Sequence, residues 1–196
     1  MFFNNKYKNF WTWFKKESNI FYMHETIPEN SLDKLHNELH KVNEFLTFEF
    51  GPKTTKREFI ISADGIKEAF NDVEKLVELK PIMENWKILK FRQRKNFDNI
   101  ITINNASLYP ENIRYVLFPY NNRIGLILFI SGFLNNEDIF KQMGYLFLDD
   151  ALGEYDVEIK IDGIKFCDYN DEYFEQSLPT RILREDFDKL CNELKL

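Results

Sequence analysis

Residues 123–132 read Arg-Ile-Gly-Leu-Ile-Leu-Phe-Ile-Ser-Gly, and this apolar run organises the predicted fold. From Ile124 to Ile130 neither side of an extended chain would be polar, which is typical of a central strand covered on both faces. Residues 114–120 read as a partner strand, joined to it by Asn121-Asn122. Asparagine tolerates the left-handed backbone of a two-residue turn, so the two strands are predicted to form a hairpin.

The segments that follow this hairpin are predicted to be a helix and another strand. Asn135 or Asn136 is placed to cap a helix that runs to about Leu152, with Gly153 as the residue that ends it. A strand is then predicted over residues 157–166. The second half of the chain therefore reads strand, strand, helix, strand.

The first half shows the same order without clear residue identity. Two strands are predicted over residues 45–50 and 57–63, with Gly51-Pro52-Lys53 as the turn between them. Asp64 is expected to cap a helix whose inward face carries Ile66, Ala69, Phe70, Val73, Leu76 and Val77. A strand over residues 86–94 follows, in which Lys90, Arg92 and Arg94 alternate onto one face.

The pattern as a whole predicts an α+β protein with mainly antiparallel sheet and packed helices. We expect one domain over residues 1–196, with pseudo-repeat halves at about 31–94 and 107–166. Further helices are expected at residues 3–21, from Ser31 as N-cap towards Val42, and at residues 184–194.

The aromatic residues near the N-terminus follow helical spacing. They form one stripe of Phe3, Tyr7, Phe10, Phe14 and Phe21. Such a stripe usually covers the core of its own protein, and the segment lacks the large basic face of an interfacial membrane helix. We therefore expect no membrane attachment, no signal peptide and no membrane-spanning segment.

Charge and cysteine content narrow the classes of partner. The 196 residues carry a formal net charge of −6, the opposite of the basic surface that phosphate binding needs, so no nucleic-acid partner is expected. Cys167 and Cys191 are the two cysteines and fit reduced packing residues of a cytoplasmic protein. The oligomeric state cannot be predicted from these features.

Standard catalytic and cofactor motifs are absent from the sequence, which contains no Gly-rich phosphate loop, no GxSxG motif and no cysteine cluster. His36 and His40 could share a metal ion on one helix face, but Glu does not directly follow the first His, and no third ligand is evident. We predict no metal, no cofactor and no catalytic residue.

The most unusual segment is acidic and lies at a predicted helix C-terminus, where negative charge opposes the helix dipole. It contains Asp149, Asp150, Glu154 and Asp156. Two interpretations stay open. The carboxylates could pair with Lys90, Arg92 or Arg94 inside the fold, or they could form a surface for a basic partner. The candidate binding residues are therefore Asp149, Asp150, Glu154, Asp156, Arg92 and Arg94.

Four stretches resemble a family of uncharacterised bacterial proteins. They are Phe10-Trp11-Thr12-Trp13-Phe14, Ser62-Ala63-Asp64-Gly65, Trp86 with Phe91-Arg92-Gln93-Arg94, and the segment from Leu148 to Asp156. The resemblance implies a bacterial cytosolic protein and transfers no catalytic residue. In composition, the chain is also similar to the immunity proteins of bacterial toxin systems.

These features favour a non-catalytic protein-binding module over an enzyme. Its specific form would be an immunity-type inhibitor of a basic toxin, because an acidic protein is steered rapidly to a basic one. One alternative is a carboxylate-dependent hydrolase or transferase that uses Asp149, Asp150 and Glu154 with Arg92 and Arg94. Another is a regulatory domain that senses a small ligand. A concave pocket would favour the enzyme, and a flat acidic surface would favour the binder.

Overall fold

The computed structural model describes residues 5–23 and 26–196. The expected helix over residues 3–21 is observed as α1, Asn5–Met23, while Phe3 and His24 lie outside the described residues. The chain divides into two compact units, Met1–Arg92 and Gln93–Leu196, and each is described by itself below. Helices and mixed sheets in both units confirm the α+β class, whereas the single domain over residues 1–196 stays a prediction.

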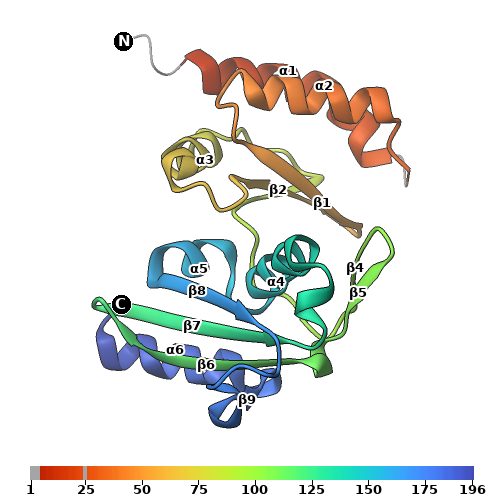
Figure 1. Cartoon of the computed structure of the whole chain (residues 1–196). Helices are drawn as coiled ribbons and strands as arrows, with labels where there is room; N and C mark the ends of the chain where they lie inside the picture. Colours follow the sequence, from red (N-terminus) through yellow and green to blue (C-terminus); the bar gives the residue numbers. More distant parts are fainter. Residues whose placement is uncertain (1–4, 24–25) are drawn as a thin grey trace. The chain divides into compact units, whose positions relative to one another are not determined.

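The first unit is a three-stranded sheet with helices (Figure 1). The sheet has the order β1-β2-β3, with β1 antiparallel to β2 and β2 parallel to β3. Its elements are α1, α2 (Glu29–His40), β1 (Thr47–Lys53), β2 (Arg57–Ser62), α3 (Phe70–Glu78) and β3 (Trp86–Lys90).

The described residues of the aromatic stripe, Tyr7, Phe10, Phe14 and Phe21, are buried in the first unit, as predicted. Phe14 is fully buried and stacks on Phe59 of β2, with ring centroids 4.6 Å apart. Trp11 Nε1 donates a hydrogen bond of 2.7 Å to the carbonyl oxygen of Leu76 in α3. Phe70 and the other inward-facing residues of α3 are buried as well. The N-terminal helix is thus part of the core of its own unit.

The second unit repeats the same connection in a larger sheet (Figure 1). Its hairpin β6–β7 is antiparallel, and after two helices the chain returns as β8, parallel to β7, in a sheet of order β8-β7-β6-β9. Its elements are β4 (Ile101–Ile103), β5 (Ala106–Leu108), β6 (Ile113–Tyr120), β7 (Arg123–Ile130), α4 (Glu137–Leu152), α5 (Glu154–Lys160), β8 (Ile161–Cys167), β9 (Leu178–Pro179) and α6 (Leu183–Leu194).

The hairpin and the central strand are confirmed in detail. Asn121 and Asn122 have φ angles of 49° and 61°, the left-handed pair that this turn requires. Leu126, Leu128 and Ile130 point into the main core of the unit, which contains buried side chains of α4, α5 and α6. The opposite face of β7 carries Gly125, Ile127 and Phe129, because successive residues of a strand alternate between faces.

Three predicted boundaries in the first unit are wrong. Helix α2 begins three residues early, at Glu29 with Pro28 in place of Ser31 as N-cap, and Ser31 is a buried residue of its first turn. Gly51-Pro52-Lys53 is the irregular end of β1, and the turn lies at residues 54–56. Asp64 has a φ of 51° in a turn and does not cap α3, which begins at Phe70 after a short 3₁₀ turn.

Further differences concern the ends of strands. The strand predicted over residues 86–94 ends at Lys90, because Phe91 adopts a left-handed φ of 59° that β geometry does not allow. Residues 157–160 belong to helix α5, where Val157 packs into the core, so burial overrides the preference of Val and Ile for strands. The short hairpin β4–β5, which turns at Asn104, was not predicted.

Candidate functional site

The acidic segment occupies the junction between α4 and α5. Asp149 and Asp150 lie in the last turn of α4, and Glu154 and Asp156 lie in the first turn of α5. Gly153, with a φ of 86°, allows one helix to end and the next to begin without an intervening loop. Glu154 and Asp156 therefore stand at a helix N-terminus, where negative charge is favourable, and not beyond a C-terminus as the sequence suggested.

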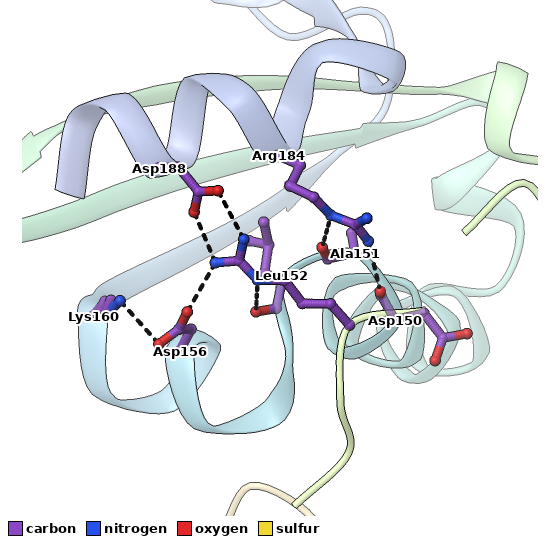
Figure 2. A network of polar contacts seen from close by, with 8 residues as sticks. Asp150, Ala151, Leu152, Asp156, Lys160, Arg184 and Asp188 are labelled. Carbon is purple, nitrogen blue, oxygen red and sulfur yellow. Dashed lines mark hydrogen bonds and ion pairs between the residues drawn. The ribbon is translucent and has the colours of Figure 1, made fainter. Parts of the chain in front are cut away.

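Arg94 connects this junction to α6, and Figure 2 labels its partners Leu152, Asp156 and Asp188. Its Nη2 donates to Asp156 Oδ2 at 2.9 Å, and its Nη1 donates to Asp188 Oδ2 at 2.9 Å. Its Nε donates to the carbonyl oxygen of Leu152 at 2.8 Å, and Lys160 Nζ lies 3.0 Å from the other oxygen of Asp156. One guanidinium thus holds α4, α5 and α6 together; we call these contacts the Arg94 network.

Two more cations, Arg184 and Lys95, bind groups in the last turn of α4. Arg184 Nε donates to the carbonyl oxygen of Ala151 at 2.9 Å, and its Nη2 lies 3.3 Å from that of Asp150 (Figure 2). Lys95 Nζ lies 3.2 Å from Asp150 Oδ1. Cationic donors on the last carbonyl groups satisfy them and offset the negative end of the helix dipole. This arrangement explains how α4 tolerates acidic residues in its last turn.

The structure therefore assigns the ion pairs differently from the sequence. Of the three predicted cations, Arg94 binds a residue of the acidic segment, and it binds Asp156. Lys90 pairs with Glu74, and Arg92 pairs with Glu49 and Asp64, all within the first unit. The predicted shared face of Lys90, Arg92 and Arg94 is wrong, because the strand ends at Lys90.

Burial also separates the four acidic residues. Glu154 is fully buried and Asp149 is 8% exposed, so neither presents a carboxylate to a partner at the surface. Asp150 and Asp156 are about a quarter exposed and lie in ion pairs. Hydrogen bonding to Arg94 lowers the pKa of Asp188 and keeps it ionised. An ionised, paired carboxylate suits structural cohesion and does not suit a general acid.

A different feature of the second unit has the shape of a binding site. The face of the sheet opposite α4, α5 and α6 contains a hollow of about 600 Å³, which we call the sheet hollow. Gly125 of β7 pairs in register with Gly163 of β8, and Phe118 of β6 pairs with Gly125 on the other side. The ring of Phe118 lies directly over Gly125, where an added Cβ would be 2.4 Å from it, whereas a Cβ at Gly163 would first meet the Tyr120 ring at 3.7 Å. The missing side chain at Gly163 therefore leaves space for the hollow.

Aromatic side chains surround the sheet hollow. Phe118, Tyr120 and Tyr173 line it and are 36%, 47% and 41% exposed, which is high for large side chains beside an apolar surface. Val116 and Ile127 supply its aliphatic floor, and Lys165 and Gln176 are polar residues of its wall. A mainly apolar concave surface with a few polar groups is typical of a binding site.

The segment 168–177 packs on the same face of the sheet, contributes Tyr173 and Gln176 to the hollow, and carries four acidic residues that we call the acidic rim. Phe174 anchors this segment, since its ring stacks on Tyr169 at 4.4 Å and meets Phe129 edge-on at 5.6 Å. The acidic rim consists of Asp168, Asp171, Glu172 and Glu175, and residues 166–180 contain no Lys or Arg. Lys165 Nζ lies 2.8 Å from Asp171 Oδ2.

Among the described cysteines and histidines, the structure shows no activated nucleophile or metal site. Cys167 is buried beneath the acidic rim, and desolvation raises the pKa of its thiol to about 11, so it stays protonated at neutral pH. The rings of His36 and His40 lie 3.8 Å apart, and burial, with His36 next, lowers the pKa of His40. The described residues contain no group of three or more His, Cys, Asp or Glu side chains able to hold a metal ion.

The sheet hollow was not predicted. Its sequence signals are Gly125 and Gly163, each inside a predicted strand, where glycine often marks a close approach or an empty space. Of the predicted binding set, Arg94 pairs with Asp156 in the second unit, Glu154 is buried there, and Arg92 forms ion pairs inside the first unit. A binding role for the set stays a prediction.

Comparisons with other proteins add no homologue. No family model matches the chain, and neither a curated protein nor a solved structure does. Among the described residues, no helix has the length and apolar character required to cross a membrane. The resemblance to an uncharacterised bacterial family stays a prediction, and the functional argument rests on the geometry of this chain.

Proposed function

We propose that this chain is a non-catalytic protein-binding module and that the sheet hollow is the centre of its binding surface. One observation supports this most directly: Phe118, Tyr120 and Tyr173 surround an apolar hollow and stay substantially exposed. Aromatic residues are enriched at the centres of protein interfaces, where they bury large areas with few rotatable bonds. A partner side chain in the hollow would bury these rings.

The shape of the site favours a protein partner over a small ligand. The hollow lies on the face of a sheet, and the rings of Phe118, Tyr120 and Tyr173 around it are 36%, 47% and 41% exposed. A partner could bury the hollow and this surrounding apolar surface together, at about 25 cal/mol per Å² of apolar area removed from water. A ligand confined to the hollow would leave the outer rings exposed. The small-ligand regulatory domain is therefore the second candidate, favoured by the hollow's volume.

The immunity-type inhibitor is the specific form of this proposal. The net charge of −6 and the acidic rim support it, because a toxin that acts on nucleic acid carries basic surface. The carboxylate-dependent hydrolase or transferase has less support: Asp150 and Asp156 lie in ion pairs and Glu154 is buried.

Site-specific photo-crosslinking tests the proposal. A benzoyl-phenylalanine replaces Tyr120 beside the hollow or, as a control, Glu185, an exposed residue of α6. Irradiation in cells that express the chain natively should give a discrete protein adduct from position 120 and none from position 185.

Filling the hollow supplies the decisive control. Gly163→Trp is suited to this, because a Cβ at Gly163 meets the Tyr120 ring at an ordinary 3.7 Å. In a Gly163→Trp background of unchanged melting temperature, the adduct from position 120 should disappear. An adduct of equal yield in that background, or the same adduct from position 185, would overturn the proposal.

A further inference from the structure

The charge around the sheet hollow indicates what kind of protein segment it selects. Tyr173 and Gln176 line the hollow, and their sequence neighbours Glu172 and Glu175 are exposed. A side chain that enters the hollow beside Tyr173 therefore places its flanking residues close to carboxylates. The acidic rim and the apolar hollow belong to one surface.

The acidic rim is only partly neutralised. Lys165 pairs with Asp171, and Asp168 accepts hydrogen bonds from the backbone N–H groups of Tyr169 and Leu134 at 2.7 Å and 3.4 Å. Hydrogen bonds from neutral amides stabilise the charge of Asp168 but leave it in place. In the part of the chain that the structure describes, neither Glu172 nor Glu175 forms an ion pair.

Arg114, a cation on the same face of the sheet, is engaged by the segment 168–177. Arg114 of β6 donates through Nε to Ser177 Oγ at 2.7 Å, and its guanidinium carbon lies 5.7 Å from the ring centre of Phe174. It therefore fixes the segment 168–177 on the sheet. With Lys165 it sets two positive charges against the four carboxylates of the acidic rim, so the rim stays net negative.

We infer that the sheet hollow binds a basic protein segment, with one large apolar side chain in the hollow and Lys or Arg on either side facing the acidic rim. This inference rests on the proposed function and adds the chemistry of the partner. Exposed complementary charges speed association and discriminate against acidic segments, whereas the apolar anchor supplies the buried area. The same negative rim disfavours nucleic acid and anionic lipid as occupants.

Peptide titrations followed by NMR test the inference on the full-length chain. The probes are three pentapeptides with a central Trp, flanked on both sides by two Lys, two Ser or two Glu, and a Lys-flanked control with Ala in place of Trp. The Lys-flanked Trp peptide should shift amide signals of residues that line the hollow, such as Tyr120 and Gly163. Its affinity should exceed that of the Ser-flanked peptide about three- to tenfold at low salt, and the gap should narrow as salt rises.

A matched pair of variants assigns the charge effect to the acidic rim. Glu172→Gln with Glu175→Gln should weaken the Lys-flanked peptide about three- to tenfold and leave the Ser-flanked peptide unchanged. Glu185→Gln with Glu193→Gln, two exposed residues of α6, should change neither peptide. Well-dispersed spectra of both variants would establish that folding is retained.

The possible results separate the two proposals. Equal binding of the three Trp peptides at the hollow would overturn the charge selection and leave the hollow as a protein-binding site. Tighter binding of the Glu-flanked peptide, or equal loss in the α6 control variant, would also overturn the charge selection. Absence of hollow shifts with every Trp peptide, or shifts that persist in Gly163→Trp, would remove both proposals.

Discussion

Replacing Arg94 with Met tests the interpretation of the acidic segment as an internal network. Met has a similar length and apolar stem but no guanidinium, so the substitution removes the contacts to Asp156, Asp188 and the Leu152 carbonyl oxygen together. If those contacts hold α4, α5 and α6 together, the free energy of unfolding should fall. If the acidic residues serve only a partner, stability should be unchanged.

The expected loss in the free energy of unfolding depends on how far each contact of Arg94 is buried. The Asp188 side chain is 49% exposed, so its pair with Arg94 contributes about 0–1 kcal/mol, as surface pairs do. Asp156 is 23% exposed, and its charged hydrogen bond and the Leu152 carbonyl contact each contribute about 1 kcal/mol. The expected loss is about 2–3 kcal/mol, or a decrease in melting temperature of about 4–12 °C for a chain of this length.

Urea unfolding and thermal melts measure this loss, with Arg123→Met as a matched control. Arg123 lies 3.7 Å from Asp162, and both side chains are at least 32% exposed, so its loss should cost less than about 1 kcal/mol. The stability of Arg94→Lys should lie between those of wild type and Arg94→Met, since Lys keeps the positive charge but lacks the planar guanidinium that donates to several acceptors at once. If the melting temperature of Arg94→Met is no lower than that of Arg123→Met, the interpretation of these contacts as a stabilising internal network is refuted.

Three further predictions concern pH, packing and thiol chemistry. Because Arg94 lowers the pKa of Asp188, the pair contributes its full stability above the unfolded pKa of about 3.9. The difference in unfolding free energy between wild type and Asp188→Asn should therefore stay constant down to about pH 5 and shrink as the pH falls below about 4, and a difference that does not shrink there would contradict this. Phe70→Ala should lower the free energy of unfolding by about 3–5 kcal/mol, since Phe70 is 6% exposed and the centre of its ring lies 4.5 Å from that of Phe91. A urea midpoint equal to that of wild type would show that this packing is wrong. Cys167 should resist Ellman's reagent at pH 8 until the chain unfolds, and rapid labelling of the native protein would contradict its buried, protonated state.

The parts of the fold that could be predicted from the sequence are those set by residues close together in the chain. The stripe of α1, the inward face of α3 and the Asn121-Asn122 turn depend on neighbouring residues, whose side-chain spacing and backbone preferences are local properties. The order strand, strand, helix, strand in each half was predicted for the same reason. Apart from the unpredicted hairpin β4–β5 and helix α5, the errors lie at element ends, where a single backbone angle, such as those of Asp64 and Phe91, decides the path of the chain.

Side-chain partners and the sheet hollow were decided by the tertiary structure. The strand ends where Phe91 turns the chain; Arg92 then pairs with Glu49 and Asp64 in the first unit, whereas Arg94 binds Asp188, which is 94 residues away in the sequence. Gly163 comes to lie opposite Gly125 through the parallel register of β7 and β8, which is set by the packing of the intervening helices on the core. Local sequence specifies which residues favour strands and helices, but contacts between distant residues depend on register and burial, which only the packed fold determines.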